Sequence, residues 1–212
     1  MKPKTRIKPG KSAEQGGRNK MRTLTIRPLA KFGLLAGCLM FAGATFAVAQ
    51  ENSPRLAQVV ALDECDPTTF NAALGPDFCK NIALAALGYA TTLSDLFQKA
   101  GEGNPDRGWD FEPDAVKIKE GTTLSVVDQG GEPHTFTEVA KFGGGFIAGI
   151  NHGEATVREC VGGFSNVAVA KTRILQASHV EITGLKKGKH LFECCIHPWM
   201  RVTVDVKSRE EE

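Results

Sequence analysis

The sequence predicts a mainly β protein, a β-sandwich or barrel preceded by a short helical segment. From Trp109 onward, apolar and polar residues alternate over short runs broken by glycine turns, which is typical of strands. Residues 50–105 instead contain Ala/Leu-rich stretches bounded by helix-capping residues. The composition, 42% apolar and 24% charged over 212 residues, is that of a globular protein and excludes a disordered or fibrous one.

The charge is unevenly distributed along the chain. Residues 1–49 carry ten Lys and Arg and one acid, whereas residues 50–212 carry 16 basic and 23 acidic side chains. A nucleic-acid partner requires clustered Lys and Arg, and the net negative charge of residues 50–212 argues against such a partner. We therefore expect no nucleic-acid partner.

The N-terminal segment has the organisation of an export signal. A basic stretch is followed by 18 uncharged residues, 32–49, which end in the small residues Ala47-Val48-Ala49. We predict that residues 1–49 are a signal peptide and that the protein is exported, to the periplasm or outside the cell. Residues 1–20 are unlike a signal, and Met21 is a more ordinary start.

Two alternatives to a cleaved signal remain open. Eighteen apolar residues are just long enough to span a bilayer as a retained anchor. The segment Leu35-Ala36-Gly37-Cys38 also resembles a lipoprotein site, although cleavage there would leave an apolar run behind. We expect contact with a membrane only if the signal is retained.

The segment 50–105 is predicted to form a helical extension. Asp66-Pro67 provides a helix cap and a proline at the first helical position. Cys65 and Cys79 flank this first helix, and a bridge between them would close a loop of about 15 residues, worth about 3 kcal/mol. The expected helices are 67–74, 81–88 and 93–100.

Residues 106–207 are predicted to form the β domain, and 208–212 a short tail. The glycine-rich stretch 143–163 interrupts this domain as a long loop or insertion. The expected strands are 116–119, 123–127, 135–139, 167–169, 174–175, 180–182, 191–193 and 202–206.

One tight turn carries the residues that indicate chemistry. It presents Cys194, His197 and Met200 at the spacing Cys-x-x-His-x-x-Met. A thiolate and an imidazole are strong copper ligands, a thioether is a weak one, and a second imidazole would complete a blue-copper set. His134 supplies that imidazole at the start of an alternating strand, 60 residues before Cys194.

Residues 109–207 resemble the cupredoxins, the small blue-copper proteins. The closing loop Cys194-x-x-His197-Pro-x-Met200 is similar to the amicyanin and plastocyanin type. Phe111–Gly121 is similar to the entry strand and turn of the family, and Val126–Thr135 is similar to the strand that carries the first ligand. Together these segments cover about half of the chain.

The resemblance implies a Greek-key fold and one type 1 copper per chain. It implies His134, Cys194 and His197 as equatorial ligands and Met200 as the weak axial ligand. The implied function is one-electron transfer rather than enzymatic catalysis, with His197 as the electron port. We expect a monomer that exchanges electrons with a redox protein whose identity the sequence does not give.

Two features depart from the family pattern. Thr135 stands where many members have an asparagine whose side chain braces the ligand loop. Whether Thr135 can replace that contact is left open. Cys195 follows the ligand directly. With Cys194 on copper four cysteines remain after the signal, and we prefer the pairs Cys65–Cys79 and Cys160–Cys195.

Other functions use the same residues. Copper storage or delivery without physiological electron transfer requires the same ligands. The full ligand set argues against a structural module with a vestigial site. A cysteine pair that binds zinc or forms disulfides, with Met200 as a core residue and His134 as a turn residue, would require four coincidences of residue type, spacing and order. We therefore prefer the copper interpretation.

Overall fold

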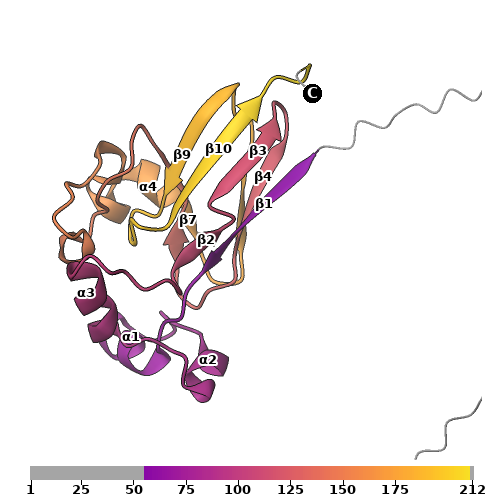
Figure 1. The fold of residues 1–212 in the computed structure, drawn as a ribbon. Coiled ribbons are helices and arrows are strands. Elements are labelled where there is room, and N and C mark those ends of the chain that lie inside the picture. The colour runs from indigo at the N-terminus through magenta and orange to yellow at the C-terminus, as the bar shows by residue number, and fades with distance from the viewer. Residues whose placement is uncertain (1–54, 211–212) are drawn as a thin grey trace, which may run out of the picture. The chain divides into compact units, whose positions relative to one another are not determined.

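The computed structural model describes residues 55–210, whose strands form two four-stranded sheets packed as a sandwich (Figure 1). One sheet has the order β2-β1-β4-β8, with β1 (Leu56–Leu62), β2 (Asp110–Glu112), β4 (Thr123–Asp128) and β8 (His179–Ile182). The other has the order β3-β10-β9-β6, with β3 (Ala115–Lys119), β10 (Arg201–Lys207), β9 (Gly188–Glu193) and β6 (Thr137–Val139). The predicted mainly β class is confirmed, as a sandwich of open sheets and not a closed barrel. The predicted signal, 1–49, lies outside the described residues.

The strand β1 corrects the prediction that 50–105 is a helical extension. It pairs in parallel with β4 and antiparallel with β2, in the interior of its sheet. Val59 and Ala61 are fully buried, so the strand contributes directly to the core. The Ala/Leu content of the segment suggested helices, and the partner strand that stabilises β1 lies more than sixty residues away, where local composition gives no sign of it.

The three predicted helices form after β1. They are α1 (Pro67–Leu74), α2 (Ile82–Leu87) and α3 (Leu93–Gly101). The Asp66 carboxylate accepts the backbone N–H groups of Thr68 and Thr69, and the Thr92 hydroxyl accepts that of Asp95, so side chains satisfy the first donors of two helices. None of the helices in the described part of the chain has the length and apolarity to cross a membrane.

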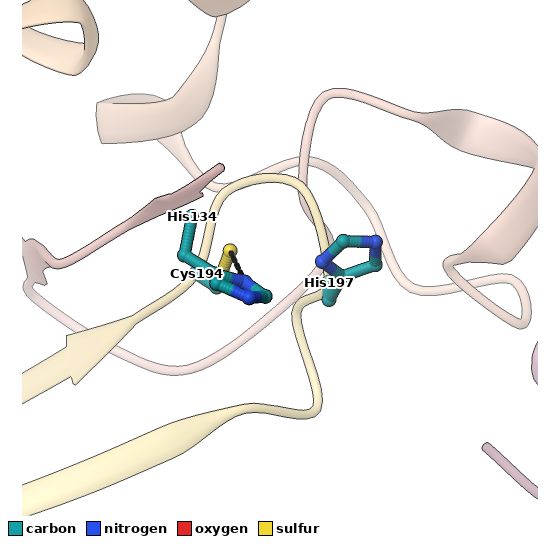
Figure 2. Close-up of side chains that lie close together, drawn as sticks. All are labelled: His134, Cys194 and His197. Carbon is teal, nitrogen blue, oxygen red and sulfur yellow. Dashed lines mark hydrogen bonds between the residues drawn. The ribbon is translucent and has the colours of Figure 1, made fainter. Parts of the chain in front are cut away.

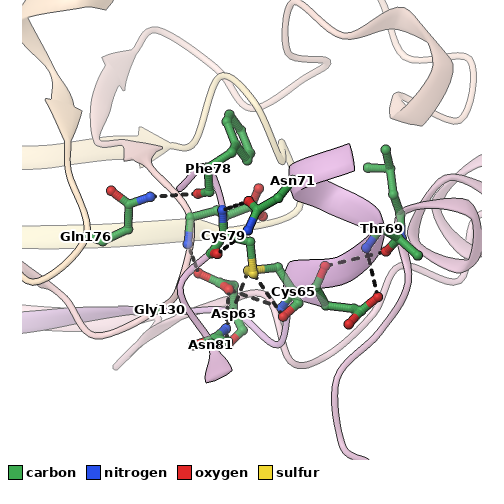
Figure 3. Close-up of a disulfide and its surroundings, with 12 residues drawn as sticks. Asp63, Cys65, Thr69, Asn71, Phe78, Cys79, Asn81, Gly130 and Gln176 are labelled. Atoms are coloured by element: carbon green, nitrogen blue, oxygen red, sulfur yellow. Dashed lines mark hydrogen bonds between the residues drawn. A yellow bond between two sulfur atoms is a disulfide. The ribbon is translucent and has the colours of Figure 1, made fainter. Parts of the chain in front are cut away.

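The preferred disulfide between Cys65 and Cys79 is confirmed and anchors α1 to the sandwich (Figure 3). The Asn71 side chain bonds both backbone groups of Cys79, at 3.0 and 2.7 Å. Gln176, which follows the short strand β7 (Arg173–Ile174), donates to the Phe78 carbonyl at 2.6 Å. The helical segment is therefore fixed to the sheets by covalent and polar contacts.

The glycine-rich insertion folds into three 3₁₀ turns, η1 (Ala148–Ile150), η2 (Arg158–Cys160) and η3 (Gly163–Ser165), followed by the helix α4 (Val167–Lys171). The prediction of a strand at 167–169 was wrong. The Asn166 side chain accepts the Ala168 N–H and starts a helix, which a three-residue alternation is too short to exclude.

The core between the sheets contains a column of aromatic rings. The ring centroids of Phe111 and Phe136 lie 5.2 Å apart, edge to face, and those of Phe136 and Phe192 lie 4.4 Å apart, stacked. Such pairs each add about 0.5–1.5 kcal/mol beyond their buried area. Phe192 lies two residues before Cys194, so this rigid column supports the predicted ligand loop.

Candidate metal centre

The turn between β9 and β10 holds three of the predicted site residues. The Cys194 N–H donates to the Met200 carbonyl at 3.1 Å, and the Met200 N–H donates to the His197 carbonyl at 3.0 Å. The turn is thus closed by its own backbone. Strand pairing of Arg201 with Glu193 fixes its two ends.

The fourth residue reaches the turn from another part of the fold. His134 begins β5 (His134–Thr135), which pairs with β7. Figure 2 shows the His134 and Cys194 side chains pointing toward one another, with His197 beside them. One potential ligand atom from each of His134, Cys194 and His197 lies within 4.8 Å of the other two.

The site is closed to solvent. His134 and Cys194 have no exposed surface, and His197 is 2% exposed. Met200 at the end of the turn is also completely buried. This corrects the expectation that His197 reaches the surface as an electron port.

Both histidines are oriented by buried carboxylates. His134 Nε2 lies 3.1 Å from Asp63 Oδ2, and His197 Nε2 lies 3.3 Å from Glu132 Oε1. These contacts leave Nδ1 of each ring for a metal, and His134 Nδ1 is 3.9 Å from Cys194 Sγ. Carboxylates that hold the distal nitrogen of a histidine are typical of protein metal sites.

The donor atoms fit copper. His197 Nδ1 is buried and has no hydrogen-bond partner, an arrangement that costs free energy unless a ligand is bound there. A thiolate with two imidazoles in one buried cluster, and a thioether in the same turn, is the donor chemistry that copper favours.

The carboxylates are themselves held in place. Asp63 accepts the Asn81 amide at 2.7 Å and the backbone N–H groups of Cys65 and Glu132 (Figure 3 shows its contacts in the helical segment). Glu132 accepts the indole N–H of Trp109. The histidines are therefore held by residues whose positions are fixed by other bonds.

The surroundings of Cys194 favour its thiolate form. Burial raises the pKa of the Cys194 thiol, but the contact with His134 Nδ1 and the nearby His197 ring outweigh burial and hold the pKa well below its usual range. Burial lowers the pKa of His134, but its bonds to Asp63 and Cys194 raise this pKa well above its usual value. The proton that a metal would displace therefore lies on the His134 imidazole and not on the sulfur.

Thr135 supplies the brace that the sequence left open. Its N–H points at the Cys194 sulfur at 3.4 Å, and its hydroxyl oxygen accepts the Cys195 N–H at 2.7 Å. The Thr137 hydroxyl donates to the same oxygen at 3.3 Å. The loop is thus bound to β5 by a hydroxyl where the family pattern has an amide.

The two adjacent cysteines have separate roles. Cys194 is the free cysteine of the described residues, whereas Cys195 bonds to Cys160. This confirms the second preferred pair. The disulfide ties the insertion to the ligand loop, and its two cysteines pack in a different buried cluster from Cys194.

A second group of buried ligand-type residues shares His134. Asp63, Asp128 and His134 also offer atoms within 4.8 Å of one another. Burial raises the pKa of Asp128 to about 7, and one of its oxygens has no hydrogen-bond partner. Since Asp63 already bonds His134 Nε2, this group surrounds the back of the imidazole.

Sequence reasoning missed Asp63 and Glu132. Asp63 follows β1, which was expected to be helical, so nothing placed it beside His134. Glu132 stands two residues before His134 in the Gly-Gly-Glu-Pro-His segment, and its position was a usable signal. An acidic residue next to a predicted ligand is a candidate for its outer hydrogen bond.

Comparison with solved structures finds chains of low sequence identity and low structural similarity score. A mutant of amicyanin in its Cu(I) form has 16% identity and a TM-score of 0.31, over 46% of this chain and 73% of that one. A purple cupredoxin from Nitrosopumilus maritimus has 12% identity and a TM-score of 0.35, over 71% of this chain and 99% of that one. No family model and no curated protein matches the sequence.

Proposed function

We propose that this protein is an exported electron carrier that binds one type 1 copper through His134, Cys194 and His197, with Met200 as the weak axial ligand. The observation that carries the proposal is the convergence of a free thiolate and two imidazole nitrogens in a sealed cluster. Copper bound there would supply a one-electron couple, Cu(II)/Cu(I).

The surrounding residues suit that couple because they are held rigidly. Asp63 and Glu132 fix the imidazoles, Thr135 fixes the loop, and the turn is closed by its own backbone. A site that moves little between oxidation states exchanges electrons with little reorganisation. This is the property that an electron carrier requires.

The closed site disfavours the alternative of copper delivery. Passing a metal ion to a partner requires a ligand that the partner can reach, whereas each of the four proposed ligands is at most 2% exposed. The two disulfides support export, since such bonds persist in oxidising compartments.

The test is the visible absorption spectrum of the purified protein after Cu(II) is added and excess metal removed. We expect an intense thiolate-to-copper band that Cys194→Ser abolishes. The double variant Cys160→Ala with Cys195→Ala is the matched control, because it removes two sulfurs next to the site and should keep the band. Loss of the band in both proteins alike, or no band in the wild type, would contradict the ligand assignment.

A further inference from the structure

We propose that a pocket beside the ligand loop binds a small phenolic ring, such as a hydroquinone, and that Trp199 is the contact through which this donor passes an electron to the metal site. The inference rests on the proposed function, and it names the class of donor and the route. In this proposal Trp199, and not His197, is the residue through which electrons enter.

Trp199 connects the buried site to the surface. Its ring centroid lies 5.4 Å from that of His197, and its indole N–H donates to the Trp109 carbonyl at 3.2 Å. Trp199 is partly exposed, whereas His197 and Trp109 are 2% and 1% exposed. Trp199 therefore lies against a proposed ligand and also reaches the outside of the protein.

A pocket of about 250 Å³ opens in front of this ring. Pro198, Trp199 and Ile150 line its apolar part, and His152, Glu154 and Arg201 line its polar part. Pockets for drug-sized ligands have volumes of about 300–1,000 Å³, so this smaller cavity suits a molecule of one aromatic ring.

The walls of the pocket are fixed. Arg201 pairs with Glu154 at 2.7 Å and donates to the Pro198 carbonyl at 2.6 Å. The buried Asn151 side chain bonds both backbone groups of Gly145, at 3.0 and 2.9 Å. A preformed pocket loses little entropy on binding a rigid ring.

His152 has an unusual backbone at the rim. Its φ of 46° is in the left-handed region, and its ring bonds the Gly101 carbonyl at the end of α3. A side chain at Gly103 would collide with this imidazole, with a Cβ only 2.5 Å from its Nε2. Strain of this kind is found preferentially where a side chain must be held for function.

The lining favours a phenol over a protein partner. Specific protein interfaces cover about 800 Å² on each partner with an apolar centre. The large exposed apolar residues of the described chain, such as Ile82 and Leu87 on α2, do not line this pocket. A ring packed on Trp199 with its hydroxyl toward His152 or Glu154 matches both parts of the lining.

The electron and proton balance is simple. The hydroquinone loses one electron, which reduces Cu(II) of the proposed site to Cu(I), and one hydroxyl O–H bond breaks. The proton leaves through the polar rim to water, and a neutral phenoxyl radical departs. No other reactant is required.

Binding can be tested without copper. The sequence has two tryptophans, so the metal-free protein gives two indole N–H signals by NMR, and Trp199→Phe assigns them. Titration with 1,4-hydroquinone should shift the Trp199 signal and leave the Trp109 signal in place, whereas 1,4-cyclohexanediol should shift neither. His152→Asn tolerates the left-handed backbone and should weaken binding by about fivefold, as expected for one lost hydrogen bond. Equal shifts of both signals, or none, would overturn the pocket assignment.

Electron transfer is tested with the copper-loaded protein. Hydroquinone should bleach the visible band at a rate that falls by about tenfold or more in Trp199→Leu, the equivalent of 1.4 kcal/mol. Trp199→Phe, which keeps a ring, should lose less, and Tyr89→Leu on the exposed segment after α2 should match the wild type. An unchanged bleaching rate in Trp199→Leu would overturn electron entry through Trp199. The presence of the thiolate-to-copper band would still support the proposed function. A wild type without a band would refute the proposed function, and the NMR titration would still decide the pocket.

Discussion

At the scale of single residues, the main feature is that each proposed imidazole ligand has a buried carboxylate behind it. Asp63 and Glu132 are 4% and 1% exposed, so their effect on the histidines is weakly screened by water. A negative charge behind a ligand stabilises the higher oxidation state of a metal. Burial raises the pKa of Glu132, while the charges of His197 and His134 lower it. In its ionised form, Glu132 should lower the reduction potential of bound copper.

This gives a prediction for Glu132→Gln. The variant keeps the shape and one acceptor oxygen but removes the negative charge that the carboxylate carries beside Cu(II). We expect it to bind copper with a similar visible band and to have a potential higher by about 60 mV or more, a tenfold change in a one-electron equilibrium. Electrochemistry on the adsorbed protein measures this shift. Lys99→Gln, at a surface ion pair, is the control, and an unchanged or lower potential in Glu132→Gln would contradict the role of its charge.

At the scale of elements, the insertion and the ligand loop form one unit through the Cys160–Cys195 disulfide. The Phe146 N–H also donates to the Cys195 carbonyl at 2.8 Å, and a Cβ on Gly145 would lie 2.1 Å from that oxygen. The backbones are therefore packed as closely as a glycine permits. The insertion stiffens the loop from outside.

The disulfide should stabilise the fold more than it affects the metal. It closes a loop with a sequence separation of 35 residues. Its removal by Cys160→Ala with Cys195→Ala should cost about 2–4 kcal/mol in urea unfolding. The visible band should persist, because Thr135 still holds the loop. A stability equal to that of the wild type would show that the insertion is held by its other contacts.

A second element-scale prediction concerns pH. Burial raises the pKa of Asp106, but bonds from Lys99 at 2.7 Å and from Gly108 and Thr91 hold it below the usual value. These bonds fix the end of α3 to the approach to β2. Because the folded-state pKa is depressed, the stabilisation is present above the unfolded pKa of about 3.9 and is lost as pH falls through the folded value.

Asp106→Asn should therefore be less stable than the wild type at pH 7, by about 1 kcal/mol after allowance for the exposed lysine. The difference should shrink toward zero as the pH falls below 3. Urea unfolding of both proteins across this range measures it, with Asp95→Asn as a control on the same helix. A difference that does not change with pH would assign the effect to packing.

At the scale of the whole molecule, the sequence predicted the parts that depend on local signals. Asp66 marks the start of the first helix, and the Cys194-to-Met200 spacing marks the ligand loop. The sequence did not predict β1, whose stabilising partner β4 is distant along the chain. The error had a consequence for the site, because Asp63 comes directly after β1 and its contact with His134 depends on that strand.

The burial of His197 also could not be predicted without the folded structure. The turn was expected to reach the surface, and locally it does, since Trp199 is partly exposed. Trp109 and Glu132 come from segments far apart in sequence and cover the imidazole. Covering of this kind depends on tertiary packing and has no local pattern.

Metal binding should stabilise the whole sandwich. The site joins β5 from one part of the fold to the loop between β9 and β10, so copper should bind the folded state much more tightly than the unfolded one. At a free concentration of 100 times Kd, the stabilisation has an upper limit of about 2.7 kcal/mol, reached when the unfolded chain binds no copper. Thermal unfolding with and without copper should show a higher midpoint for the loaded protein, and Cys194→Ser should remove the difference. An equal gain in Cys194→Ser would place the metal elsewhere.

A crystal structure of the copper-loaded protein, with anomalous scattering measured at the copper edge, tests the ligand assignment directly. We expect a single strong peak bonded to Cys194 Sγ and to Nδ1 of His134 and His197, with Met200 Sδ at a longer distance. A peak among Asp63, Asp128 and His134 Nε2, or no peak at Cys194, would contradict it.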